Sequence, residues 1–254
     1  MQILQITDTH LYGSASGKLR GVETDPSLRA TLDEAFARVP NYEAVLVTGD
    51  LVQDDKSGYL RFRSLFGSLA KPVLCIPGNH DEPETMRNEL TGEPFKICGA
   101  HTIRDWTFVM LDSYDPGHVG GRLTKNELAR LDTALSLAPK HAMVCLHHHP
   151  IVMGSRWLDS VGLAEAEAFW SVIDQHTNVR AVVWGHVHQA FDGKRGDVRL
   201  LATPSTGAQF LPKSDRYAVD SAPPAYRSFE LHADGRIDSQ VHWVESAQLR
   251  QAAS

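Results

Sequence analysis

Residues Val73–Asp81 read VLCIPGNHD, a short apolar run that ends abruptly in a Gly-Asn-His turn. The run contains β-branched residues and stops at Pro77 and Gly78, a pattern typical of a buried strand whose carboxyl end carries polar side chains. In proteins that alternate strands and helices, ligand-binding residues lie at such strand ends. We therefore expect functional residues directly after this strand.

Four further apolar runs end in the same way. Each polar tip alone is weak evidence, because a strand-end cap or a simple turn also explains it. Five tips separated by helix-length segments are not explained by coincidence, and we expect them to meet at one edge of a sheet. The four tips are Asp8-Thr9-His10 after Ile3–Thr7, Gly49-Asp50 after Ala44–Thr48, His147-His148-His149-Pro150 after Ala142–Leu146, and Gly185-His186-Val187-His188 after Val179–Trp184.

Amphipathic segments between these runs predict helices. Asp25 and Pro26 are typical of a helix start, and apolar residues then repeat at helical spacing. A second set of apolar residues at helical spacing covers Tyr59–Leu69. Thr124–Glu127 has the spacing of a capping box, which marks a helix start. Another helix is expected over Leu163–Gln175. Alternating strands and helices over residues 1–188 indicate an α/β layered fold.

Beyond Gly193 the pattern changes to strands. The last two expected strands, Tyr226–Leu231 and Ile237–Trp243, are joined across Ala233–Arg236, which is a hairpin signal. We expect residues 1–254 to form a single domain. In it, residues 1–192 form the core that carries the five polar tips, and residues 193–246 form a mostly β tail that packs as part of the second sheet.

Composition excludes several classes of partner. The net charge is −6 and the pI about 6.1, so no attraction to nucleic acid or to an anionic membrane is expected. No apolar stretch approaches the roughly 20 residues of a membrane-spanning helix, and no secretory signal is evident. The three cysteines lack paired spacing and are expected to be small buried hydrophobes in a reducing compartment, so cytoplasmic location is the default.

The spacing within the tips suits metal binding. In extended chain, residues i and i+2 point the same way, so Asp8 and His10 can reach one ion, and His186 and His188 share this geometry. Asn79 is an unusual metal ligand, and its neighbour His80 can act separately.

In the order Asp-x-His, Gly-Asp, Gly-Asn-His-Asp, His-x-Pro and Gly-His-x-His, the motifs resemble those of the calcineurin-like metallophosphoesterases. The likeness to the bacterial class III cyclic AMP phosphodiesterases is closer and spans nearly the whole chain. It implies an α/β fold in which a two-sheet β-sandwich is flanked by helices. The additional matching stretches are Leu4–Leu11, Leu146–Pro150, Trp157–Asp159, Leu200–Thr206 and Leu231–Gly235.

The resemblance also implies a two-metal ligand set with Asp50 as the shared carboxylate. The His-x-Pro spacing selects His148, although either neighbouring histidine could take its place. Imidazole and carboxylate ligands suit iron or manganese, with zinc or cobalt as alternatives. One metal would be held by Asp8, His10, Asp50 and His188, and the second by Asp50, Asn79, His148 and His186.

The activity implied by the resemblance is hydrolysis of 3′,5′-cyclic AMP to 5′-AMP by a hydroxide held between the two metal ions. His80, together with Asn79, is expected to contact the substrate phosphate, and His80 to assist the leaving group. Asp81 is expected either to fix the tautomer of His80 or to form a surface salt bridge.

Other readings stay open at this point. A broader phosphodiesterase acting on glycerophosphodiesters or 2′,3′-cyclic nucleotides would use the same metal site, whereas a non-catalytic interaction module would have lost ligands. Trp157 and Phe210 would either stack on a base or pack in the fold. The resemblance further implies a small-molecule cyclic nucleotide as the partner and a possible homodimer.

Overall fold

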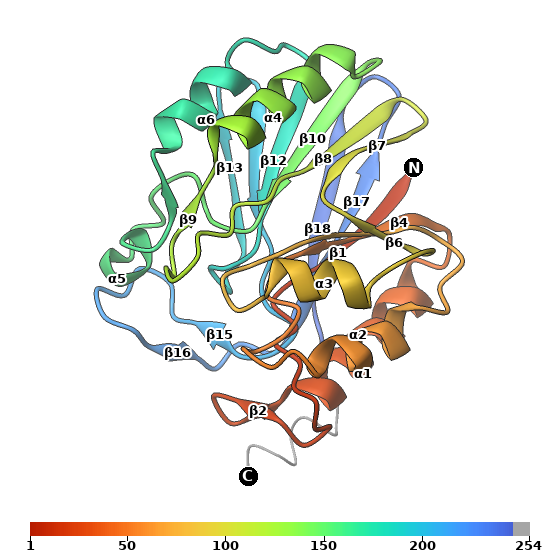
Figure 1. Cartoon of the computed structure of the whole chain (residues 1–254), viewed down its shortest axis with the longest axis vertical. Helices are drawn as coiled ribbons and strands as arrows, with labels where there is room; N and C mark the ends of the chain where they lie inside the picture. Colours follow the sequence, from red (N-terminus) through yellow and green to blue (C-terminus); the bar gives the residue numbers. More distant parts are fainter. Residues whose placement is uncertain (246–254) are drawn as a thin grey trace.

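The computed structural model describes residues 1–245, in which two six-stranded sheets pack face to face with helices on both outer faces (Figure 1). The strand order in the first sheet is β18 (Ile237–Trp243), β17 (Ala225–Leu231), β1 (Gln2–Ile6), β4 (Tyr42–Thr48), β5 (Val73–Ile76) and β6 (Phe95–Ile97). The order in the second sheet is β13 (Phe191–Arg195), β14 (Val198–Ala202), β12 (Val179–Trp184), β10 (His141–Leu146), β8 (Trp106–Met110) and β7 (Gly99–Ile103).

The helices divide between the two sheets. Helices α1 (Thr24–Arg38), α2 (Gly58–Phe66) and α3 (Pro83–Glu89) cover the first sheet, and α4 (Lys125–Leu137) and α6 (Ala166–Ile173) cover the second. Within the described residues, no helix combines the length and the hydrophobicity that crossing a membrane requires. The short elements are α5 (Arg156–Asp159) and the strand pairs β2 (Lys18–Leu19) with β3 (Val22–Glu23), β9 (Gly121–Arg122) with β11 (Leu163–Ala164), and β15 (Gln209–Phe210) with β16 (Val219–Asp220).

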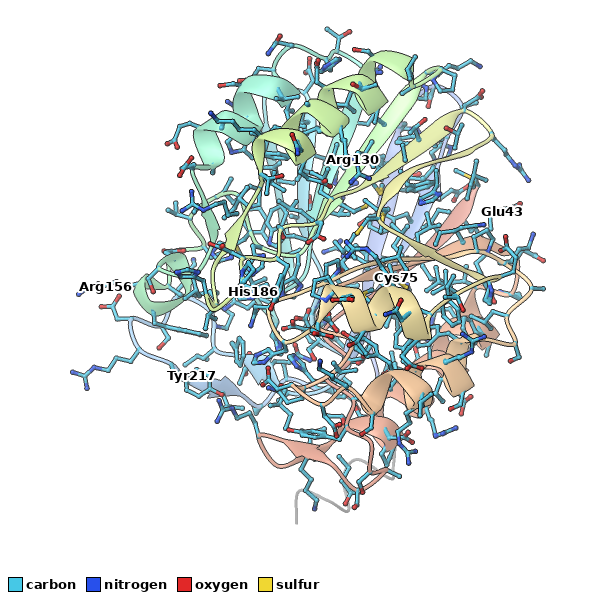
Figure 2. The ribbon with its side chains drawn as sticks, viewed as in Figure 1. Glu43, Cys75, Arg130, Arg156, His186 and Tyr217 are labelled. Carbon is cyan, nitrogen blue, oxygen red and sulfur yellow. The ribbon has the colours of Figure 1, made fainter. Side chains whose placement is uncertain are left out.

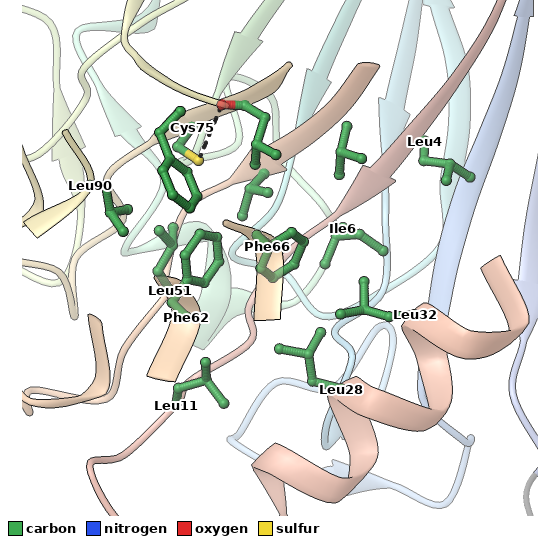
Figure 3. Packing of buried hydrophobic residues seen from close by; sticks show 14 of the residues in the cluster. Leu4, Ile6, Leu11, Leu28, Leu32, Leu51, Phe62, Phe66, Cys75 and Leu90 are labelled. Carbon is green, nitrogen blue, oxygen red and sulfur yellow. Dashed lines mark hydrogen bonds between the residues drawn. The ribbon is translucent and has the colours of Figure 1, made fainter. Parts of the chain in front are cut away.

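The central strands are buried on both faces, which explains why they read as continuous apolar runs. In β4, Ala44 and Leu46 belong to the apolar cluster between the sheets, whereas Val45 and Val47 belong to the cluster under the helices. Figure 3 shows this second cluster, in which the rings of Phe62 and Phe66 stack at 4.3 Å. Each central strand therefore stabilises two layers at once.

The fold class expected from the sequence is confirmed, but the polar tips do not share one sheet. Strands β1, β4 and β5 run parallel in the first sheet, whereas β10 and β12 run parallel in the second. The chain changes sheets between β6 and β7, a step that apolar patterning does not record. The expectation of one sheet edge was wrong, because the tips come from the carboxyl ends of two facing sheets.

The β tail also divides between the sheets. Strand β14 pairs with β12 in the second sheet, but β17 pairs antiparallel with β1 in the first sheet, and β18 follows it across the expected hairpin. Phe229 and Leu231 of β17 join the cluster between the sheets, so this hairpin extends the buried face and removes β1 from the sheet edge. Residue 246 of the expected tail, and residues 247–254 of the expected domain, lie outside the described residues.

Helix boundaries differ modestly from the expectations. Thr124 Oγ1 accepts a hydrogen bond from the Glu127 N–H (3.1 Å), as the capping-box spacing predicts, but the Glu127 carboxylate binds the Asp112 N–H instead (3.0 Å). Helix α6 is shorter than Leu163–Gln175, because Leu163 pairs with β9 before the helix begins.

Candidate metal centre

The turns that carry the predicted ligands have unusual backbone conformations. The φ angle is 53° at Asp8, 45° at His10, 51° at Asp50, 63° at His186 and 47° at His188. Non-glycine residues rarely adopt this left-handed region, which costs of order 1–3 kcal/mol per residue, and those that do concentrate at functional sites. Backbone bonds hold the turns in place, since Asp8 N–H donates to the Gly49 carbonyl (3.0 Å) and His10 N–H to the Asp50 carbonyl (2.9 Å).

Two glycines allow the turns to approach one another closely. A Cβ atom at Gly78 would collide with the backbone nitrogen and the carboxylate of Asp50. A Cβ atom at Gly185 would collide with the Thr7 hydroxyl and the Asp8 carboxylate. The glycines before Asn79 and His186 are therefore required by the packing of the site itself.

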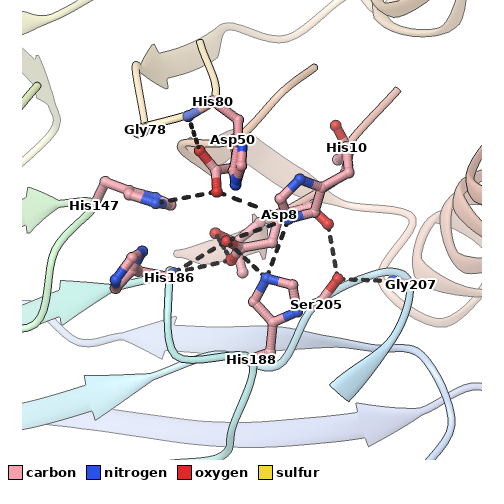
Figure 4. A network of polar contacts seen from close by, with 12 residues as sticks. Asp8, His10, Asp50, Gly78, His80, His147, His186, His188, Ser205 and Gly207 are labelled. Carbon is pink, nitrogen blue, oxygen red and sulfur yellow. Dashed lines mark hydrogen bonds and ion pairs between the residues drawn. The ribbon is translucent and has the colours of Figure 1, made fainter. Parts of the chain in front are cut away.

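The first half of the site brings together Asp8, His10, Asp50 and His188 (Figure 4). The Nε2 atoms of His10 and His188 lie 3.1 Å apart, and His188 Nε2 lies 3.3 Å from Asp8 Oδ1. His188 Nδ1 binds the Ala208 carbonyl (2.6 Å), which leaves the Nε2 lone pair facing His10 and Asp8. Two facing lone pairs beside carboxylates form a site that a cation would satisfy.

The second half is centred on His147. Its Nε2 atom lies 3.4 Å from Asp50 Oδ2 and 3.3 Å from Asn79 Oδ1, while its Nδ1 atom binds the Thr48 carbonyl at 2.8 Å. The His186 ring lies 5.0 Å from the His147 ring. A histidine oriented by a backbone carbonyl, with its other nitrogen facing a carboxylate and an amide oxygen, has the arrangement of a metal ligand.

His148 has a different environment from His147. Its Nδ1 atom lies 2.8 Å from Ser113 Oγ and its Nε2 atom 3.2 Å from the Val119 carbonyl. A neutral imidazole that accepts from the hydroxyl and donates to the carbonyl uses both nitrogens in this way. Ligand atoms of His147, His148 and His186 still lie within 4.8 Å of one another, but the contacts favour His147 as the neighbour of Asp50.

Electrostatics also mark this region as a cation site. Burial lowers the pKa of His147, but the Asp50 and Asp8 carboxylates and the Thr48 carbonyl together outweigh burial and raise that pKa to about 9. Burial instead dominates at His10 and lowers its pKa to about 3, so His10 is neutral and one ring nitrogen has a lone pair available to a metal. Burial would raise the pKa of Asp50, yet His147 and neighbouring histidines hold it well below its ordinary value. Asp50 is thus an anion at the middle of the cluster.

The donor set fits two metal ions. Groups able to hold a metal include Asp8 with His10 and His188, and Asp8 with Asp50 and His147. His186 Nε2 is a buried atom without a hydrogen-bond partner among the described residues. Buried polar atoms are normally paired, so such an atom within a carboxylate-imidazole cluster is consistent with coordination.

His80 lies at the rim of the cluster and is 31% exposed. Its Nδ1 atom lies 2.9 Å from Asp54 Oδ2, and its backbone N–H donates to Asp50 Oδ1 (2.9 Å). Burial lowers the pKa of His80, but Asp50 and Asp54 together raise it above its ordinary value. Asp54 was not anticipated from the sequence, in which Gln53-Asp54-Asp55 reads as a charged turn.

Asp81 does not contact the side chain of His80, and neither role expected of it is correct. Its buried carboxylate accepts hydrogen bonds from the N–H groups of Leu51, Val52 and Gly78 and from the Tyr59 hydroxyl. Asp81 therefore holds together the turns after β4 and β5, whereas Asp54 and the Gln53 amide, each 2.9 Å from His80 Nδ1, orient His80.

Comparison with known proteins decides the family. A model of the calcineurin-like phosphoesterases matches residues 1–190. The chain belongs to the calcineurin-like phosphoesterase family. Within this family, it is 39% identical over 254 residues to the 3′,5′-cyclic adenosine monophosphate phosphodiesterase CpdA of Vibrio vulnificus, covering 97% of this chain and 91% of that protein. It is 36% identical to the protein of the same name from Escherichia coli K12, covering 95% of this chain and 89% of that protein.

Solved structures of this fold agree with the architecture. A dimetal phosphatase from Danio rerio superposes with a TM-score of 0.67 at 14% sequence identity, covering 96% of this chain and 99% of that one. The protein TT1561 of Thermus thermophilus superposes with a TM-score of 0.63 at 15% identity, covering 96% and 99% of the two chains. The family membership and fold expected from the motifs are confirmed.

Proposed function

We propose that this phosphoesterase hydrolyses 3′,5′-cyclic AMP to 5′-AMP at a centre of two metal ions. The observation that carries the proposal is the position of Asp50, whose Oδ2 atom lies 3.7 Å from His10 Nε2 and 3.4 Å from His147 Nε2. A carboxylate between two groups of imidazoles can be shared by two cations. The substrate is proposed from the relatives named as 3′,5′-cyclic adenosine monophosphate phosphodiesterases, at 35–39% identity.

The ligand set proposed here follows the contacts. The described contacts support His147 in place of His148, because both ring nitrogens of His148 already have protein partners. When bound, two such ions neutralise the charge of a phosphodiester and lower the pKa of water between them. One ion would be held by Asp8, His10, Asp50 and His188, and the other by Asp50, Asn79, His147 and His186.

His80 is the proposed catalytic residue outside this ligand set. One of its nitrogens lies within 4.8 Å of ligand atoms of His10 and Asp50, and Asp54 binds its Nδ1 atom. In the reaction, the oxygen of water bonds to phosphorus, the P–O3′ bond breaks, and a proton is delivered to the departing 3′ oxygen. A half-exposed imidazole with a raised pKa is suited to hold the phosphate and to donate that proton.

The finer assignments belong to the same proposal. We propose iron or manganese as the metals, since a mixed imidazole and carboxylate set suits them. Cytoplasmic location is supported by three cysteines that are free and buried. The homodimer expected from the resemblance stays a prediction.

The test is a comparison of substrates. Protein reconstituted with iron or manganese is assayed on 3′,5′-cyclic AMP, 2′,3′-cyclic AMP and a glycerophosphodiester, with metal-free protein as the control. We expect the highest kcat/KM on the 3′,5′ ring and no turnover by the control. Equal or higher kcat/KM on a glycerophosphodiester would contradict the cyclic AMP assignment and favour the broader phosphodiesterase.

A further inference from the structure

Three aromatic side chains form a cluster beside the metal centre that no ligand assignment uses. Trp157 lies on α5, and Phe210 and Tyr217 lie on the hairpin of residues 209–220 that contains β15 and β16. Their ring centroids are 5.2 to 5.4 Å apart, at interplanar angles of 68° to 79°. Rings prefer this edge-to-face geometry, so the three side chains form one defined surface.

The cluster is attached directly to a proposed metal ligand. The Phe210 ring stacks on the His188 ring with a centroid distance of 4.1 Å and an interplanar angle of 11°. The Phe210 N–H also donates to the His188 carbonyl (3.3 Å). A molecule bound beside His188 would therefore lie close to Phe210, and Phe210 in turn contacts Trp157 and Tyr217.

The outer part of the cluster is open to solvent. Tyr217 is 41% exposed, and Leu211 and Val219 on the same hairpin are 43% and 46% exposed. Figure 2 shows Tyr217 on this hairpin, on the same side of the structure as His186. The indole Nε1 of Trp157 is covered but has no hydrogen-bond partner among the described residues. Trp157 packs against the apolar core of the second sheet, but Tyr217 and its apolar neighbours on the hairpin stay exposed. Exposed apolar groups gathered beside a site indicate a binding surface.

A positively charged arginine side chain lies against the same aromatic cluster. The Arg20 guanidinium lies 4.8 Å from the centroid of the Tyr217 ring. The whole chain has a net charge of −6, so this cation supplies positive charge locally to an anionic ligand. A planar guanidinium also stacks on aromatic rings, including those of bases.

We propose that Trp157, Phe210 and Tyr217 bind the nucleobase of the substrate, which stacks on the exposed Tyr217 ring. This inference rests on the proposed function, because the base of a cyclic nucleotide lies one ribose away from the phosphate at the metal centre. Stacking on aromatic rings accepts every base. The cluster thus selects nucleotides over glycerophosphodiesters without distinguishing adenine from guanine.

The test compares two ligands that differ only in the base. Calorimetric titration measures the binding of 5′-AMP and ribose 5-phosphate to metal-reconstituted wild type, Tyr217→Ala, Tyr217→Phe and Trp243→Ala. Trp243, on edge strand β18, is also 41% exposed and serves as the matched control. We expect wild type to prefer 5′-AMP, Tyr217→Ala to lose about tenfold of that preference, and Tyr217→Phe and Trp243→Ala to keep it.

Trp157→Ala provides a second variant, for which the same loss of preference is expected. Equal binding of the two ligands by wild type, or a preference that survives in both alanine variants of the cluster, would overturn the inference. The proposed function is judged separately by cyclic AMP hydrolysis with wild type. A protein that prefers 5′-AMP through Tyr217 but hydrolyses a different nucleotide diester would keep the base site and lose the cyclic AMP assignment.

Discussion

The two sheets contribute different chemistry to the metal centre. The first sheet supplies every oxygen ligand of the proposed set, from Asp8, Asp50 and Asn79 after β1, β4 and β5. The second sheet supplies only imidazoles, from turns after β10 and β12. Contacts such as His147 Nε2 to Asp50 Oδ2 (3.4 Å) therefore join the two sheets. The Asp50 carboxylate and the His147 imidazole, whose pKa is raised to about 9, attract each other across the sheets, and a metal ion held by ligands from both sheets would join them further.

A polar bridge without metal ligands lies beneath this end of the sheets. Gln5 in β1 is fully buried, and its Nε2 atom donates to Thr48 Oγ1 (2.9 Å) and to the Trp184 carbonyl of the second sheet (3.2 Å). Its Oε1 atom accepts from Thr203 Oγ1 (2.6 Å). Thr203 Oγ1 in turn accepts from the Arg227 Nε–H (3.2 Å). Because none of these groups belongs to the proposed ligand set, the bridge holds the sheets in register without a metal, whereas the site above it depends on one.

The largest effect is expected when the shared carboxylate of the first sheet is removed. Asp50→Ala should lower kcat/KM by about 10⁴-fold or more. Losses of this size are seen when one member of a group of residues that act together in catalysis is removed. Metal analysis by mass spectrometry should show that both ions are reduced, because both halves of the site contact Asp50. Retention of two ions per chain by a folded variant would show that Asp50 is not shared.

Loss of His80 should affect chemistry and not metal binding. His80→Ala should lower kcat by roughly 10²- to 10⁴-fold, the usual contribution of a general acid or base. The metal content should match that of wild type, because His80 is outside the proposed ligand set. If the variant loses its metals, His80 is a ligand and the division of roles is incorrect.

Metal removal should weaken the association of the two sheets. At a free metal concentration of 100 Kd, each site contributes about 2.7 kcal/mol to the free energy of unfolding, and losing one site would lower Tm by roughly 5–10 °C. Calorimetry with and without a chelator measures this difference. Asp50→Ala is the matched control and should show little response to the chelator. An unchanged Tm in wild type would mean that the metals do not link the sheets.

The smallest effect concerns the orientation of His80. Asp54→Ala removes the carboxylate that lies 2.9 Å from His80 Nδ1, and kcat should fall about 10- to 100-fold. Asp55→Ala is the matched control, because the Asp55 carboxylate binds the Gly13 and Ser57 N–H groups instead. Equal losses in the two variants would indicate a general effect of the loop and remove the specific role of Asp54.

The local part of the site could be predicted from the sequence. The ends of β1, β4, β5, β10 and β12 are visible because apolar runs stop at polar residues, and their motifs identified the family. The sequence could not decide between His147 and His148 as the metal ligand. That decision depends on the contacts of His148 with Ser113 and Val119, which lie about 30 residues away in the chain. The contact of Trp157 with Tyr217 was hidden for the same reason, because it joins α5 to a distant hairpin.

The pair His147→Ala and His148→Ala tests most directly whether a first-sheet carboxylate and a second-sheet imidazole hold the same ion. Metal bound per chain is measured for both variants after reconstitution, alongside wild type and with circular dichroism to verify folding. We expect His147→Ala to lose the ion that His147 shares with Asp50 and Asn79, whereas His148→Ala should keep the wild-type metal content. Loss of metal from His148→Ala alone, with His147→Ala fully loaded, would contradict this expectation.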